Sequence, residues 1–428
     1  MNLVWNQFDY STLTGGLSTS GSPVIVDEIG IILVLGLLSA RAASLLRIPV
    51  IVPLILTGLI IGPSGLSILS PTSFGFSIAG VAFFLVPLYL FGTGLETDLR
   101  ELRKVAKSVL LLATLGVAIT TIGVAGISYY VLRLPLTISL LVGGIVSATD
   151  PIVIFPLLKS GKLAPKIAAV AGGESALNDP TSIVIFTIIL SVVAGQSPPS
   201  GPIIAFDFVR LLFGGVGVGL LVGVASMALV ERFRFRDQMN YASVVIFTVA
   251  YGLADALGTS GIAAAMISGM VVGAAMKERF TAFERQQVNY LWSIVAFVTQ
   301  VAIFLLLGVY APVGTFGEGN FLLGLGISAS LIFLVRPAAV WASTALDDIS
   351  PREKALISWV GARGAVPAAL AFALIGYSVS IPSLKPYTET VFSIVLFIVL
   401  VTVLVSGFTT GFLAKRLGVQ AGASAESG

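Results

Sequence analysis

The stretch Ser147-Ala148-Thr149-Asp150-Pro151 places a proline and an aspartate inside an apolar window that runs from about residue 135 to 158. Proline lacks a backbone N–H and its ring clashes with the carbonyl four residues earlier, so a helix through this window is expected to open at Thr149 and Asp150. A second apolar window contains Gly361-Ala362-Arg363-Gly364-Ala365-Val366-Pro367. Both interruptions carry a charged residue. The pattern therefore predicts two broken helices and a polar site within an apolar bundle.

The composition around these interruptions is typical of an integral membrane protein. Of the 428 residues, 56% are hydrophobic and only 11% are charged, whereas a soluble domain carries about a quarter charged residues. The net charge of +3 is spread over short loops, which does not favour binding to nucleic acid. The chain has no cysteine, which excludes disulfides and thiolate metal sites, and no histidine. Proton chemistry near neutral pH therefore falls to carboxylates or lysines.

Hydropathy predicts an all-α polytopic protein of the cell membrane with about thirteen transmembrane helices. The windows lie near residues 26–46, 49–64, 76–96, 106–131, 135–158, 172–195, 205–231, 240–257, 260–276, 288–312, 320–346, 354–378 and 387–414. Loops on one side of this topology hold 19 Lys and Arg residues, and loops on the other side hold three. This imbalance predicts an external N-terminus and an internal C-terminus. Residues 1–418 would form one transmembrane domain, with residues 419–428 as a short disordered tail.

The interrupted windows are the fifth and the twelfth, seven spans apart. Two six-helix units joined by the seventh helix would have opposite orientations, and the broken helices would then occupy equivalent places. Such an inverted repeat with paired broken helices points to a transporter with a site near the membrane midplane. The alternative is that both interruptions are simple kinks, because Gly and Pro are common in membrane helices.

The sixth window begins with Gly172-Gly173-Glu174-Ser175-Ala176-Leu177-Asn178-Asp179-Pro180. Ser175 and Asp179 are four residues apart and share one helix face, with Glu174 and Asn178 on the neighbouring face. Carboxylate, hydroxyl and carbonyl oxygens bind hard cations, so Asp179 and Ser175 are predicted to bind a cation together with Thr149 and Asp150.

Two neighbouring carboxylates cannot both stay charged without a cation, so this site is expected to hold either a cation or protons. The alternative is that the acidic residues only form salt bridges between helices. We prefer that interpretation for Glu174, with Arg336 as its partner.

At these residues the sequence resembles the monovalent cation:proton antiporter superfamily, within it the NhaP-type and sodium/proton exchanger branch. The resemblance rests on Thr149-Asp150-Pro151, Gly173 to Pro180, Arg336-Pro337 and Gly361-Ala362-Arg363-Gly364-Ala365, which occur in the expected order. With the predicted topology it covers the whole chain.

The resemblance implies a homodimer in the lipid bilayer, in which each protomer has a mobile transport bundle (about residues 76–195 and 288–378) and a dimerisation part made of the remaining helices. It implies cation ligation by Asp150, Asp179, Ser175 and the Thr149 carbonyl. It also implies supporting roles, including an ion pair between Glu174 and Arg336 and a structural role at the helix crossing for Arg363. The supporting set is Asn178, Glu174, Arg336, Arg363, Pro151 and Pro180.

The function predicted is antiport of Na⁺ or Li⁺ against H⁺. The electrogenic branch has Asp at the position of Asn178, so one fewer titratable group is consistent with electroneutral one-for-one exchange. Exchange of K⁺ for H⁺ at the same site is the alternative, because the sequence does not determine the cavity size. A cation channel is less favoured, since a channel would be expected to repeat a selectivity filter around a symmetric pore. No enzyme activity and no cofactor are predicted.

One departure concerns the third window. Many close relatives place a glutamate directly after a phenylalanine there, whereas Phe91 is followed here by Gly92 and the nearby acid is Glu96. Glu96 is expected to pair with Arg100 or Arg103 in the adjoining basic loop and not to bind a cation.

Overall fold

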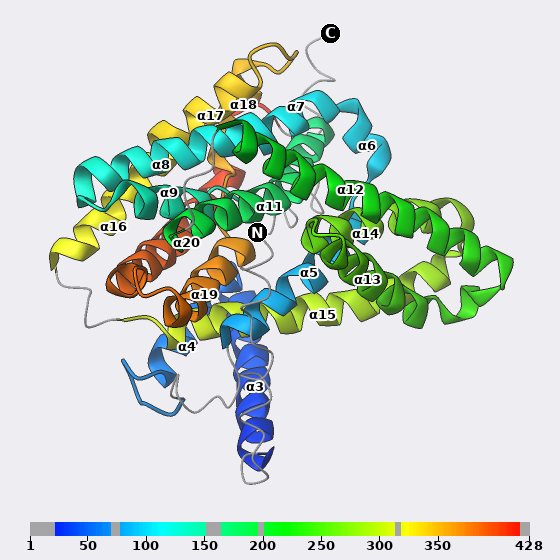
Figure 1. The fold of residues 1–428 in the computed structure, drawn as a ribbon, viewed down its shortest axis with the longest axis horizontal. Helices are drawn as coiled ribbons and strands as arrows, with labels where there is room; N and C mark the ends of the chain where they lie inside the picture. The colour runs from blue at the N-terminus through cyan, green and yellow to red at the C-terminus, as the bar shows by residue number, and fades with distance from the viewer. Residues whose placement is uncertain (1–21, 70–77, 151–163, 196–200, 313–317, 420–428) are drawn as a thin grey trace.

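A computed structural model describes residues 22–69, 78–150, 164–195, 201–312 and 318–419. The regular secondary structure of these ranges is all helical, without a β-strand, as Figure 1 shows. Eight of the described helices are long and apolar enough to cross a membrane, and four more apolar helices are shorter. The predicted all-α polytopic class is therefore confirmed. Every predicted window overlaps a described helix, while the count of thirteen spans and their orientation stay predictions.

The helices of the first half are α3 (Ser22–Leu46), α4 (Ile51–Ile61), α5 (Ile78–Glu96), α6 (Leu99–Lys104), α7 (Ala106–Leu111), α8 (Val117–Leu132), α9 (Leu136–Ile145) and α11 (Pro165–Val193). A π-helical turn, Leu112–Gly116, joins α7 to α8 without interrupting the helix direction. The predicted tail falls almost wholly outside the described residues, which end at residue 419.

The helices of the second half are α12 (Gly201–Arg232), α13 (Met239–Ala256), α14 (Gly261–Arg279), α15 (Ala282–Val309), α16 (Glu318–Ser330), α17 (Arg336–Ser343), α18 (Pro351–Trp359), α19 (Ala365–Ser380) and α20 (Thr388–Leu417). The predicted window 354–378 is thus two helices, α18 and α19, separated by the glycine-rich interruption. This break is where the sequence predicts it.

Short sequence signals begin several of these helices. Thr281 starts α15 with a capping box, in which its side chain accepts from the Glu284 N–H and Glu284 accepts from the Thr281 N–H. Ser350 and Glu353 form the same arrangement at α18. The start of α11 differs from the prediction, because the helix begins at Pro165 and not near residue 172. Proline is well suited to the first helical turn, where no N–H partner is needed.

The packing brings α5 to the middle of the described bundle, where it contacts α14, α15 and α19 (Figure 1). Small residues allow the closest of these contacts. A Cβ on Gly269 of α14 would collide with the Phe91 carbonyl of α5. The resemblance implies that α5 and α15 belong to the transport bundle, yet they also pack on α14 and α4 from the other part. The division into two parts stays a prediction.

Candidate functional site

The first interruption opens earlier than predicted. Helix α9 ends at Ile145, four residues before Thr149, where the break is expected. The Gly144 carbonyl accepts hydrogen bonds from Ser147 Oγ at 2.8 Å and from Ser182 Oγ at 2.7 Å. If the helix continued, the Gly144 carbonyl would accept a backbone hydrogen bond from the next turn. The two hydroxyls take this place, and such side-chain bonds compete with helix formation. The chain from residue 148 to 150 is therefore non-helical.

The amide of Asn178 on α11 fixes the open segment at Thr149. Its Nδ2 donates to Thr149 Oγ1 at 2.7 Å, and its Oδ1 accepts from the Thr149 N–H at 3.3 Å. The hydroxyls of Thr149 and Ser175 lie 3.0 Å apart in a hydrogen bond. All three side chains are buried. A carboxamide suits this position because it supplies a donor and an acceptor at once.

Asp150 joins the first interruption to the second. Its backbone N–H donates to the Ala362 carbonyl at 2.8 Å, and its Oδ2 accepts from the Ala365 N–H at 3.1 Å. Ala365 is the first residue of α19, so the carboxylate caps the positive end of that helix. Gly364 is required by this approach, since a Cβ there would collide with the Asp150 side chain.

Asp179 lies on α11 one turn beyond Ser175 and is only 6% exposed. Its carboxylate interacts electrostatically with Asp150, but within the described part of the chain no hydrogen bond or ion pair reaches it. Pro180 follows inside the helix, so the Ala176 carbonyl loses its helical donor. The described residues contain no cluster of three acidic side chains that could hold a multivalent metal.

Glu174 and Arg336 form a buried ion pair between α11 and α17. Arg336 Nη2 donates to Glu174 Oε2 at 2.7 Å, while Nη1 donates to Oε1, and the two residues are 1% and 5% exposed. Arg336 Nη2 also donates to the Ile357 carbonyl at 3.4 Å. This two-pronged geometry is the strong form of an arginine–carboxylate contact.

Arg363 lies in the second interruption and is completely buried. Its Nη1 donates to the Ala148 carbonyl at 3.3 Å, and its backbone N–H donates to Thr402 Oγ1 at 3.0 Å. Its Nε and Nη2 have no hydrogen-bond partner among the described residues. The positive charge of Arg363 therefore lies against the non-helical segment that follows α9, where backbone carbonyls lack helical hydrogen bonds.

The structure thus brings Thr149, Asp150, Ser175 and Asn178 into one bonded region and puts Asp179 on the same face of α11 as Ser175. Pro151 lies outside the described residues.

Several residues of this region were missed from the sequence. These are Ser147, Ser182, Gly364, Ala365 and Thr402. Ser147, Gly364 and Ala365 lie in the two quoted interruptions, but nothing there indicated their partners. Ser182 and Thr402 are ordinary helix residues whose roles depend on contacts between distant segments.

A family model described as "Sodium/hydrogen exchanger, transmembrane" matches residues 30–416. The chain is 31% identical over 361 residues to the Na⁺/H⁺ antiporter 1 of Methanocaldococcus jannaschii, covering 81% of this chain and 82% of that one. It is 28% identical to the K⁺/H⁺ antiporter NhaP2 of a Shewanella strain, covering 84% of this chain and 62% of the relative. It is also 28% identical to sodium/hydrogen exchanger 7 of Arabidopsis thaliana, of which it spans only 34%, against 86% of its own length.

Among solved structures, the sodium proton antiporter MjNhaP1 from Methanocaldococcus jannaschii at pH 8 has the same fold. The TM-score is 0.81 at 27% identity, and the match covers 92% of this chain and 98% of that one. The match to the family model covers most of the chain, and the described helices agree with a multi-pass membrane protein. This chain therefore belongs to the sodium/hydrogen exchanger family, whose members are secondary transporters.

Proposed function

We propose that this protein is a secondary antiporter that exchanges Na⁺ or Li⁺ for H⁺ across a cell membrane. The observation that carries the proposal is the state of Asp179. Its carboxylate is buried on the same α11 face as Ser175, next to the open backbone, without a hydrogen bond or ion pair in the described part of the chain. A buried carboxylate needs either a cation or a proton to offset its charge.

Competition for this position provides the exchange. With a cation bound, Asp179 is ionised, and Ser175, Thr149 and Asp150 offer further oxygen ligands of the kind that hard cations prefer. With a proton bound, the carboxyl is neutral and the cation has left. The site can turn from one side of the membrane to the other when Asp179 holds a cation or a proton, but not when Asp179 is empty and charged. Exchange of one ion for the other is then obligatory.

The proposed stoichiometry is one cation for one proton. Its support is Asn178, whose amide both donates to and accepts from Thr149. An ionised carboxylate has no donor and could not make both bonds. Asn178 therefore holds the open backbone without adding a second titratable group to α11.

Exchange is tested in proteoliposomes that contain the purified protein, an internal pH dye and an imposed proton gradient. Addition of Na⁺ should dissipate the gradient in wild type, while Asp179→Asn should abolish the response. Asp255→Asn removes another acid on α13 and is the control that should behave like wild type. If Na⁺ and Li⁺ leave the wild-type gradient intact, the proposal is wrong.

Potassium is the second candidate cation, favoured by the similarity to a protein named as a K⁺/H⁺ antiporter. The same dye assay with Na⁺, Li⁺ and K⁺ over a range of concentrations distinguishes the two. A potassium-selective response would replace the sodium proposal while keeping the site. Currents far above exchanger turnover would instead favour a channel.

We also propose the thirteen-span topology with an external N-terminus, an internal C-terminus and inverted repeats that cross at the two interruptions. The support is the succession of described helices and the contacts of Asp150 with Ala362 and Ala365. The chain has no cysteine, so single cysteines can be introduced directly. An impermeant maleimide should label Arg133→Cys from outside and Arg234→Cys only from inside.

The resemblance further supports a homodimer in the plasma membrane, with a mobile transport bundle in each protomer. Light scattering of the protein in detergent measures the mass of the complex and tests the dimer directly.

A further inference from the structure

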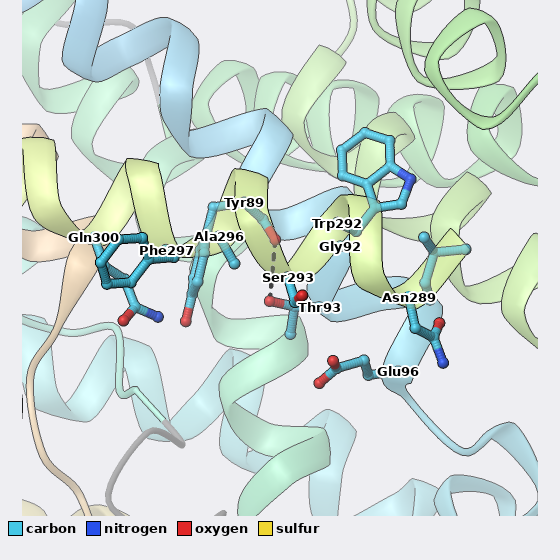
Figure 2. Close-up of a pocket in the computed structure, with 11 residues that line it drawn as sticks. Tyr89, Gly92, Thr93, Glu96, Asn289, Trp292, Ser293, Ala296, Phe297 and Gln300 are labelled. Carbon is cyan, nitrogen blue, oxygen red and sulfur yellow. Dashed lines mark hydrogen bonds between the residues drawn. The ribbon is translucent and has the colours of Figure 1, made fainter. Parts of the chain in front are cut away.

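A cavity of about 240 Å³ lies between α5 and α15, apart from the site described above (Figure 2). Its walls come from one face of each helix, since the lining residues recur at intervals of three and four. Polar groups on this lining include Thr93, Glu96, Asn289, Ser293 and Gln300. The volume is enough for several water molecules.

The wall on the α15 side is held in place by aromatic packing. The Trp292 ring packs against Phe91 of α5 in a tilted arrangement, with ring centroids 4.5 Å apart, and its indole N–H donates to Ser243 Oγ at 2.9 Å. On α5, Thr93 Oγ1 donates to the Tyr89 carbonyl at 3.1 Å. The cavity is therefore a formed feature of the α5–α15 contact.

Among the described residues that line this cavity, Glu96 alone carries a charge (Figure 2). The expectation that Glu96 pairs with Arg100 or Arg103 is wrong for Arg100, which bonds Glu278 at 3.0 Å. Within the described ranges, no ion pair involves Glu96 or Arg103. Beside it, Lys277 pairs with Asp98 at 3.3 Å. Arg100 and Lys277 are thus paired with other acids, and no ion pair within the described ranges compensates the carboxylate of Glu96.

The cavity extends along α5 toward the buried aspartates. Tyr89 lines it two turns before Glu96, and the electrostatic field of Asp150 and Asp179 reaches the Tyr89 side chain. Helix α5 also contacts both α11 and α19, which carry the site. A path from Glu96 past Thr93 to Tyr89 therefore leads from the exposed end of α5 into the bundle.

We propose that this cavity is a waiting site for a hydrated monovalent cation, with Glu96 as the residue that attracts it. The neutral oxygens of Thr93, Asn289 and Ser293 replace part of the water shell, and Glu96 raises the local cation concentration. This inference rests on the proposed antiport, because it assigns a step that precedes binding at Asp179. One carboxylate among neutral oxygens holds a monovalent cation weakly, as release toward the deeper site requires.

The test is Na⁺-driven proton movement in proteoliposomes at low ionic strength, with Glu96→Gln compared with wild type. Removal of the charge should raise the half-saturating Na⁺ concentration about threefold to tenfold, while the maximal rate at saturating Na⁺ stays near wild type. Addition of about 0.2 M choline chloride should shrink this difference, because salt screens an exposed charge. Glu96→Asp keeps the charge and should restore most of the affinity.

Asp237→Asn is the matched control. It removes one acidic charge from the loop between α12 and α13, on the same proposed side of the membrane and outside the cavity. It should leave the Na⁺ dependence unchanged. Unfolding temperatures of all variants establish that each one is folded.

The inference is overturned if Glu96→Gln has the wild-type Na⁺ dependence, or if Asp237→Asn shifts it equally. Either result leaves the proposed function intact, provided that wild type exchanges and Asp179→Asn does not. If wild type itself moves no protons in response to Na⁺, Li⁺ or K⁺, the proposed function fails and the waiting site with it.

Discussion

Replacing Arg336 with methionine should strongly destabilise the protein. The guanidinium of Arg336 makes two parallel bonds to Glu174 and one more to the Ile357 carbonyl, in a place from which water is excluded. Removing it leaves the Glu174 carboxylate buried without its partner. Breaking a buried pair in this way costs about 3–5 kcal/mol, more than the bonds themselves contribute, because the remaining charge is not solvated.

The same reasoning predicts recovery in a double variant. Replacing both residues with apolar ones of similar size, Arg336→Met with Glu174→Leu, removes the stranded charge and should restore most of the lost stability, since such replacements are often neutral. SDS titration of the detergent-solubilised protein, followed by tryptophan fluorescence, gives the free energy of unfolding for each variant.

An exposed pair of the same chemistry provides the control. Arg279 bonds Glu231 at 2.6 Å, and both side chains are substantially exposed. Arg279→Met should leave the unfolding curve within experimental error of wild type, because water solvates the freed Glu231. The reasoning about Arg336 is refuted if Arg336→Met unfolds like Arg279→Met, or if the double variant is less stable than Arg336→Met alone.

Three further changes give separate expectations. Gly364→Ala should abolish transport, because its Cβ collides with the carboxylate that caps α19, whereas Gly217→Ala meets open space and should retain wild-type rates in the dye assay. Asn178→Asp loses the donor to the threonine hydroxyl and adds a titratable group, so a potential-sensitive dye should report reduced transport that is no longer electroneutral. Burial raises the pKa of Asp347, but hydrogen bonds from Ser108 and a nearby lysine outweigh it and hold the pKa below 3.8. Asp347 therefore stabilises the fold above that pH, and this contribution is lost as the pH falls through the lowered pKa. Ser108→Ala should reduce thermal stability at pH 7, with a difference that shrinks below pH 3.8.

The sequence predicts which residue types form the site better than it predicts the contacts between distant segments that hold them. Spacing along one helix put Ser175 and Asp179 on a common face, and the structure agrees, because helix geometry is a local property. The position where α9 ends was predicted too late. Its end depends on Ser182, which is 38 residues from Gly144 in the sequence. A bond between distant helices leaves no local pattern by which it could be recognised.

The role of Asp150 shows the same limit more sharply. Proline at the next position indicated an open backbone, and the carboxylate was therefore predicted to face a cation. In the structure this carboxylate also accepts the Ala365 N–H, 215 residues away. Nothing near Asp150 in the sequence indicates which helix N-terminus would receive it. Gly364 is needed for this contact because a Cβ there would collide with the Asp150 side chain. This requirement can be recognised only when the partner is known.

The contrast between the two aspartates explains how one site can serve two ions. The backbone N–H at the start of α19 offsets part of the charge of Asp150. Asp179 has no such partner within the described residues, although it is equally deep. A buried carboxylate without such a partner needs a proton or a cation to offset its charge. The exchange chemistry that we propose therefore belongs to Asp179, and Asp150 shapes the place where the cation sits.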